Sequence, residues 1–295
     1  MHKVRLLCFD GGGVRGLASL EVLIRISKRF PNWRNSVDAF VGTSTGSIIA
    51  ALLAYGKTPT EVKKLYLKYM KKIFSRNICH RICTLGGLVG SKYRSSMLRE
   101  IADEVFGNIK FKMVMKGLII TAYNLKEHKL EVYMNDFLIN SNSAATPSMH
   151  IKDAVLRSSA APMYFDSIDG YVDGGVFSNN PVGVALASLN IIDSFLDNVW
   201  CLSIGTGTLS EGGWTKTCPH GGLLSWSTGI IDLFMESMSK TCVYEAKHIL
   251  KERYLRIQPI LEKAVSFDDC GNNKTIIRAG AKVEIDLDWI RKFLL

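Results

Sequence analysis

The sequence has few of the features that mark disulfide-rich, zinc-binding or membrane-spanning proteins. Its seven cysteines are odd in number and irregularly spaced, which excludes a paired disulfide framework. Cys79 and Cys83 lie closest together, but no further ligands follow at the spacing of a zinc site. No apolar run is long enough to span a membrane, and the first residues lead directly into a strand rather than a secretory signal. We therefore expect a cytoplasmic protein.

Acidic residues are scarce relative to basic ones. The 295 residues include 37 Lys and Arg against 27 Asp and Glu, giving a net charge of +10, and 47% are hydrophobic. Such a surface suits an anionic membrane or nucleic acid. Lysines cluster only at 59–74, where helical spacing predicts an amphipathic helix that either packs on the core or touches a membrane. No internal repeat or linker is found, so residues 1–295 are expected to form one domain.

A serine stands at the centre of the most informative stretch. The apolar segment 39–41 leads into Gly-Thr-Ser-Thr-Gly at 42–46, and a helical run of small residues follows. Gly-x-Ser-x-Gly between a strand and a helix is typical of a nucleophile elbow, in which Gly42 and Gly46 allow a tight turn that exposes Ser44. Helix N-terminal N–H groups favour developing negative charge there. The alternative is that Ser44 only caps the helix.

A glycine-rich turn precedes the serine. The predicted strand 4–9 ends in Asp-Gly-Gly-Gly-Val-Arg-Gly at 10–16, and residues 17–30 have helical spacing. The glycines fit a dinucleotide-binding fingerprint with Asp38 as its acid, but Asp38 precedes the second strand instead of ending it. A P-loop is excluded because no Gly-Lys-Ser/Thr follows. We favour an oxyanion hole for Ser44, because adjacent parallel strands bring both turns to one edge.

A nucleophilic serine needs a base. None of the six histidines lies in a context built for catalysis, and the one credible candidate is His220, between a proline and two glycines. The α/β-hydrolase fold is disfavoured because Ser44 comes too early in the chain. Asp173 ends a short strand and precedes Gly174 and Gly175, so its carboxylate could lie in a cleft, although an Asp-Gly turn is common in any protein. Partial burial would raise its pKa and make it a better base at neutral pH.

The rest of the chain alternates between helical and strand patterns. Helices are predicted at 95–106 (capped by Ser95), 151–159 and 287–295, and strands at 116–124, 130–135 and 254–257. The apolar side of a helix around 223–238 either packs on the sheet, which we favour, or forms an acyl-chain wall or a membrane contact. Residues 268–273 lack the ligand spacing of a calcium loop and are predicted to form a turn.

Three motifs, in this order, resemble those of the patatin-like phospholipase family: residues 10–16, 42–46 and 173–175. Similar segments at 159–162, 179–181 and 203–207 extend the resemblance over about residues 4–210, and the segment 211–295 is expected to pack on this core. The resemblance implies an α/β fold of three layers, α/β/α, with a mainly parallel central sheet. It also implies lipid acyl hydrolysis by a Ser–Asp dyad without a metal or another cofactor.

The resemblance assigns roles residue by residue. Ser44 corresponds to the nucleophile and Asp173 to the general base, and the oxyanion donors correspond to Gly11, Gly12 and Gly13. Arg15 matches the family's basic position in that loop, and the supporting motif glycines are Gly16, Gly42, Gly46, Gly174 and Gly175. The expected partner is a phospholipid or another acyl lipid, with peripheral membrane contact and no nucleic acid. Two alternatives stay open: an acyltransferase on the same dyad, and a non-catalytic lipid- or nucleotide-binding module.

Overall fold

The computed structural model describes residues 3–75, 80, 83–84, 89–136, 146–189, 195–210 and 230–295. Its centre is a seven-stranded sheet in the order β4-β3-β2-β1-β6-β8, with β5 also paired to β3. The strands are β1 (Val4–Phe9), β2 (Ala39–Thr43), β3 (Gly117–Asn124), β4 (Lys129–Met134), β5 (Tyr171–Asp173), β6 (Val199–Ile204) and β8 (Tyr254–Ile257). A small separate sheet pairs β7 (Thr208–Leu209) with β9 (Ile260–Leu261).

The main sheet is largely parallel, as expected. The pairs β1–β2, β1–β6, β2–β3 and β6–β8 are parallel, whereas β4 and β5 run antiparallel to β3. β1 and β2 are apolar and almost wholly buried, because helices cover both faces of the sheet. Phe9 at the end of β1 lies opposite Gly42, so the glycine turn and the serine turn leave neighbouring carboxyl ends of the sheet. Sites in open α/β sheets form at such an edge.

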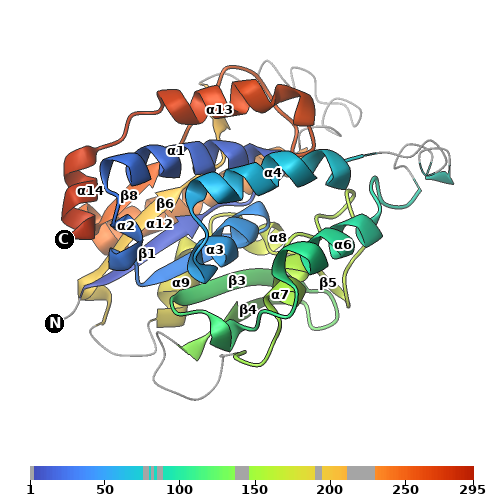
Figure 1. Ribbon diagram of the computed structural model, residues 1–295, viewed down its shortest axis with the longest axis horizontal. Coiled ribbons are helices and arrows are strands. Elements are labelled where there is room, and N and C mark those ends of the chain that lie inside the picture. Colours follow the sequence, from blue (N-terminus) through green and yellow to red (C-terminus); the bar gives the residue numbers. More distant parts are fainter. Residues whose placement is uncertain are drawn as a thin grey trace.

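Helices form a layer on each face of the sheet, which confirms the expected α/β/α architecture (Figure 1). Side chains alternate along each strand, so Phe40 packs into one layer and Val41 into the other. One layer contains α1 (Gly16–Arg29), α3 (Thr45–Tyr55), α4 (Pro59–Ile73), α6 (Ser95–Phe106), α7 (Ile151–Ser158), α13 (Asn273–Lys282) and α14 (Leu287–Leu294). The other contains α9 (Val182–Leu189) and α12 (Ile230–Leu250), and short helices form at α2 (Trp33–Ser36) and α8 (Gly175–Ser178).

Two helix starts show how well local patterns predict boundaries. In α4, Thr58 and Glu61 form a reciprocal capping box around Pro59, and the buried side packs on the core, as the spacing suggested. In α6 the predicted cap is wrong. Arg94 is the N-cap residue and makes no side-chain cap, whereas the Ser95 hydroxyl accepts the Asp166 N–H at 3.1 Å. The Ser95 hydroxyl, which the sequence pattern assigns to the helix cap, is therefore occupied by the backbone of a residue 71 positions later in the chain.

The C-terminal segment completes the sheet and one helical layer. β8 pairs with β6, and α13 packs against α1, where Arg25 donates to the Gly280 and Val283 carbonyls. Residues 230–238 of the helix predicted around 223–238 belong to α12, which runs from Ile230 to Leu250, whereas residues 223–229 lie outside the described residues. Within the described ranges, no helix combines the length and apolar character needed to cross a membrane.

Candidate active site

Ser44 occupies a sharp turn between β2 and α3. Its φ of 55° and ψ of −125° are uncommon for a residue with a side chain, and they match the strained turn of a nucleophile elbow. Glycines are required on both sides because the backbones cross closely: a Cβ on Gly42 would collide with the Gly46 carbonyl, and one on Gly46 with the Phe9 carbonyl. Ser44 makes no side-chain cap to α3, so the simple capping interpretation does not hold.

A second serine fixes the turn. The Ser44 N–H donates to the Ser158 hydroxyl at the end of α7, at 2.9 Å. The Ser44 carbonyl accepts from both the N–H and the hydroxyl of Ser47, at 2.8 and 2.6 Å. The backbone of the elbow is therefore held on both sides. Sequence reasoning missed Ser158, because a serine inside a helix carries no local pattern that points to a partner 114 residues away.

β3 places Asp173 beside Ser44. β2 pairs with β3 up to Thr43, which lies opposite Thr121. β5 pairs with the same edge of β3 immediately beyond, where Asp173 lies opposite Ala122. β2 and β5 thus lie end to end along β3, with Thr43 and Asp173 at their meeting ends, and Ser44 follows Thr43 directly. Gly174 is needed here because a side chain would collide with Thr121.

Asp173 is buried, and its environment makes it a stronger base than an ordinary aspartate. Burial raises the pKa of Asp173 to about 7, against the lowering effect of hydrogen bonding from the Ser44 hydroxyl and from the Gly175 N–H, which lies 2.7 Å from Oδ1. The carboxylate therefore accepts a proton near neutral pH. Asp173 does form an Asp-Gly turn, as the simpler interpretation holds, but its carboxylate also accepts a hydrogen bond from the Ser44 hydroxyl.

Two glycines of the glycine turn border the same pocket as this pair. Gly12 and Gly13 line the same pocket as Ser44 and Asp173, and their N–H groups have no hydrogen-bond partner among the described residues. Gly11 differs from the expectation, because its N–H donates to the Asn179 carbonyl at 3.0 Å. Available donors for an oxyanion are therefore those of Gly12 and Gly13. Gly13 has a φ of 56°, and a Cβ there would collide with the Phe267 carbonyl.

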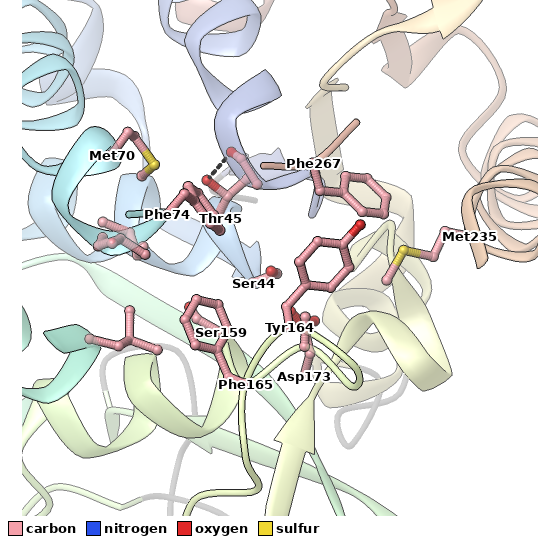
Figure 2. A pocket seen from close by; sticks show the side chains of 16 residues that line it. Ser44, Thr45, Met70, Phe74, Ser159, Tyr164, Phe165, Asp173, Met235 and Phe267 are labelled. Atoms are coloured by element: carbon pink, nitrogen blue, oxygen red, sulfur yellow. Dashed lines mark hydrogen bonds between the residues drawn. The ribbon is translucent and has the colours of Figure 1, made fainter. Parts of the chain in front are cut away.

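Thr45 and Tyr66 tie the glycine turn to the elbow. The Thr45 hydroxyl donates to the Gly13 carbonyl at 2.8 Å, the bond drawn in Figure 2. The Tyr66 hydroxyl, buried in α4, donates to the Thr45 carbonyl and lies 2.7 Å from its hydroxyl. Because Thr45 follows the nucleophile directly, this connection sets the distance between the serine and the proposed oxyanion donors.

A buried ion pair anchors the start of the glycine turn. The Arg256 guanidinium, on β8, bonds to both carboxylate oxygens of Asp10, with 2.7 Å between Nη1 and Oδ1. It also donates to the hydroxyls of Ser203 and Ser239 and to Gln258. Burial lowers the pKa of Arg256, but the neighbouring Asp10 outweighs this effect and raises it, so the guanidinium stays charged. Sequence reasoning did not identify Arg256, which lies 246 residues after its partner.

The Arg15 side chain is held by contacts with a carboxylate and an aromatic ring. One of its terminal nitrogens lies 3.2 Å from Asp232 Oδ1 in α12, and its guanidinium stacks on the Phe267 ring at 4.2 Å. Burial raises the pKa of Asp232, and the neighbouring Arg15 opposes that rise. Gly16 follows at the start of α1, where a Cβ would lie 2.9 Å from the Thr45 hydroxyl.

The pocket above Ser44 is narrow and apolar. Its volume is about 50 Å³, and Figure 2 shows aromatic and methionine side chains around Ser44 and Asp173. The apolar lining consists of Ile48, Met70, Ile73, Phe74, Leu98, Ala161, Tyr164, Phe165, Met235 and Phe267. Met235 comes from the helix that the sequence suggested as an acyl-chain wall. The buried Ser159 hydroxyl, also in the lining, has no hydrogen-bond partner among the described residues.

Histidine does not contribute to the described part of the site. His80 bonds to the Ser91 carbonyl, His248 to the Tyr244 carbonyl, and His150 lies near Asp153. His220, the one candidate base of this type, lies outside the described residues. Among the residues that are described, no group of three His, Cys, Asp or Glu side chains is placed to hold a metal ion.

Comparison with known proteins identifies similar sequences. A family model described as patatin-like phospholipase matches residues 7–186. The cGAMP-activated phospholipase of Escherichia coli (strain TW11681) is 28% identical over 250 residues, 73% of this chain and 68% of that protein. Patatin-like protein 1 of Oryza sativa subsp. indica is 25% identical over 310 residues, 87% of this chain and 74% of that protein. CotR of Bacillus subtilis (strain 168) is 29% identical over 210 residues, 70% of this chain but only 64% of CotR.

A solved structure shares the fold. VipD from Legionella pneumophila superposes with a TM-score of 0.50 and 15% sequence identity, over 100% of this chain and 67% of VipD. The likeness supports the arrangement of sheet and helical layers described above.

Proposed function

Because the chain belongs to the patatin-like phospholipase family, we propose that it is a lipid acyl hydrolase that cleaves fatty-acyl esters through an acyl-enzyme on Ser44. The observation that carries this proposal is the placement of Ser44, in a strained elbow, beside a buried aspartate whose pKa is raised to about 7. The Escherichia coli relative is named a phospholipase, and so is the intracellular phospholipase A2 of Caenorhabditis elegans, which is 34% identical over 185 residues, 61% of this chain and 16% of that protein. These names favour a phospholipase A or lysophospholipase type of reaction.

The first half of the reaction forms the acyl-enzyme. Asp173 takes the proton of the Ser44 hydroxyl as Oγ attacks the ester carbonyl, and the carbonyl electron pair moves to oxygen. The N–H groups of Gly12 and Gly13 stabilise that oxyanion, as an oxyanion hole requires. When the carbonyl re-forms, the bond to the leaving oxygen breaks, and this oxygen takes the proton from Asp173.

The second half releases the fatty acid. Asp173 then accepts a proton from water, which attacks the acyl carbonyl and forms the same oxyanion. Collapse breaks the bond to Oγ, and Ser44 regains its proton from Asp173. A raised pKa suits this double role, because a group that accepts and returns a proton works best when its pKa lies near the working pH.

The surroundings of the dyad suit a lipid. The apolar pocket over Ser44 favours a hydrocarbon chain. Three apolar residues that are close in sequence to this site have largely exposed side chains: Met163 (59%), Phe177 (52%) and Phe234 (60%). Met163 and Phe234 each precede a residue of the pocket lining, and Phe177 lies in α8, directly after the base. Exposed apolar residues around a site favour a lipid surface, so the proposed function includes peripheral contact with membranes.

The test is fatty-acid release from a phospholipid with labelled acyl chains. Wild type is compared with Ser44→Ala, Asp173→Asn and the matched control Ser27→Ala, which removes a hydroxyl in α1 that donates to the Ile24 carbonyl. We expect loss of release in the first two variants and retention in the third. A fluorophosphonate probe should label wild type and Ser27→Ala but not Ser44→Ala.

Near-wild-type release by Ser44→Ala would overturn the proposal. Absence of labelling together with tight lipid binding would instead identify a non-catalytic module. Transfer of the labelled chain to an added lysolipid, in place of release to water, would assign an acyltransferase on the same residues.

A further inference from the structure

A second cavity adjoins the catalytic pocket and has a different chemical character. Its volume is about 510 Å³, roughly ten times that of the pocket over Ser44, and charged and hydroxyl side chains line much of it. Met235, which reaches from α12 toward the catalytic pocket in Figure 2, lines both cavities. The mechanism proposed above makes no use of this larger space.

The two cavities adjoin each other beside Asp173, the proposed general base. A methyl group built on Gly175 would lie 3.0 Å from Asp173 Oδ1, 3.3 Å from Asn179 Oδ1 and 2.6 Å from Met235 Cε. These three atoms therefore surround one point. Asn179 belongs to the lining of the larger cavity, and its Oδ1 is buried without a hydrogen-bond partner among the described residues. A buried acceptor without a partner costs stability unless a ligand or water satisfies it.

The chemistry of the leaving group points to the same junction. In ester cleavage the leaving oxygen takes its proton from the base, so the alcohol half of the substrate must pass close to Asp173. The acyl half occupies the apolar pocket, and the oxyanion faces Gly12 and Gly13. The side of Asp173 that remains is the one toward Asn179 and Met235, where the polar cavity begins.

The charges in the cavity restrict what can bind there. Its three cations are all paired with carboxylates of the same wall: Arg15 with Asp232, Lys240 with Glu236, and Arg256 with Asp10. A fourth carboxylate, Asp269, has no cationic partner in this wall and accepts from the Gly271 N–H and from Asn272. The lining thus has a surplus of negative charge and of hydrogen-bond acceptors, which repels an anion and favours a donor.

We infer that this cavity binds the alcohol half of the lipid substrate and selects head groups that donate hydrogen bonds and carry no net negative charge. The inference rests on the proposed function, because it assigns the cavity to the leaving group of the Ser44 reaction. Met235 forms the wall that keeps the acyl chain and the head group in separate compartments.

The experiment compares lipids that share their acyl chains and differ in head group: phosphoethanolamine, a neutral glycoside and phosphoglycerol, which is anionic. Presenting them in micelles of an uncharged detergent removes the attraction of this basic protein to an anionic surface. The measured quantity is the ratio of kcat/KM for the anionic lipid to that for each of the other two. We expect wild-type ratios below one.

Two matched variants locate the effect. Asp269→Asn and Asp286→Asn each remove one negative charge and keep an amide oxygen that can accept the capping N–H, which lies at 3.0 Å in one case and 2.8 Å in the other. Only Asp269 lines the cavity. We expect Asp269→Asn to raise the anionic ratio by about tenfold, the size of one like-charge contact of about 1.4 kcal/mol. Asp286→Asn should keep the wild-type ratio.

Wild-type ratios of one or more, or equal ratios in wild type and Asp269→Asn, would overturn the inference. A 4-nitrophenyl ester of a short fatty acid, which has no head group, separates this outcome from failure of the proposed function. If Ser44-dependent hydrolysis of that ester persists while the head-group ratios are flat, the hydrolase stands and the cavity assignment falls. If neither substrate is cleaved in a Ser44-dependent way, both fall.

Discussion

Replacing Asp173 by asparagine should make the folded protein more stable at neutral pH while it removes the proposed base. The reason is the cost of keeping a buried carboxylate ionised. The pKa of Asp173 rises from 3.8 to about 7 in the fold, mainly through burial. Each pKa unit corresponds to about 1.36 kcal/mol, so ionisation costs the folded protein about 4 kcal/mol more than it costs the unfolded chain.

The sign of the pH dependence follows from the two titrations. Below about pH 4 the carboxyl is protonated in both states and contributes no pH dependence. Between about pH 4 and pH 7 the unfolded chain ionises while the folded protein keeps the proton, so wild type loses stability as the pH rises. Above that range both states are ionised, and the loss is complete. Asparagine does not titrate, and all other groups cancel when the two proteins are compared.

Urea unfolding at pH 4 and pH 8 measures this directly. The free energy of unfolding of Asp173→Asn minus that of wild type should grow by about 2–4 kcal/mol between the two pH values, allowing for relaxation around the charge. Asp197→Asn is the control, because its side chain is 89% exposed and remains in water in both states. A difference that stays constant with pH, or that shrinks toward pH 8, would refute the assignment of a buried, reluctantly ionised carboxylate.

Three further outcomes follow from the site. Hydrolysis of a soluble ester should rise through an apparent pKa near 7 and level off above it, because only ionised Asp173 accepts a proton; a profile that is flat from pH 6 to pH 8 would contradict this. Arg256→Met leaves Asp10 buried without the guanidinium that pairs with it, so urea titrations should show a free energy of unfolding lower by about 3–5 kcal/mol. A change under about 1 kcal/mol would show that the ion pair does not anchor the glycine turn. Gly13→Ala should lower kcat by about 10²–10³. The control is Gly170→Ala, which also has a positive φ but has open space around it and should keep the wild-type kcat. Equal effects of the two substitutions would rule out a specific role for the glycine turn.

Features set by local chemistry could be predicted from the sequence. The buried strands at 4–9 and 39–41, the helix at 59–74 and the hairpin around 117–134 all lie within a residue or two of their expected bounds. The order of motifs placed both glycine-containing turns at one sheet edge, and the structure confirms that β1 and β2 are neighbours. Each of these follows from apolar periodicity or from glycine in a tight turn, which short stretches of chain determine alone.

Contacts between distant segments could not be predicted in this way. Nothing in the three residues of β5 indicates that they extend the line of β2 along β3, yet this pairing brings Asp173 to Ser44. The same holds for the Gly11 N–H, whose partner is the Asn179 carbonyl rather than a substrate, and for Arg256, whose partner lies at the other end of the chain. Such partners are chosen by tertiary packing, and the residue types involved have no distinctive spacing.

The pairing of Asp10 with Arg256 also orders events during synthesis of the chain. Every residue assigned to the dyad and its glycine turn has been made before residue 180, but the guanidinium that neutralises the buried Asp10 belongs to β8 and is made 246 residues after its partner. Domains fold as units while the ribosome extends the chain. A growing or truncated chain that ends before β8 therefore contains the nucleophile without an anchored glycine turn. The proposed esterase activity should therefore begin only after β8 has emerged, so that the order of synthesis itself delays the reaction.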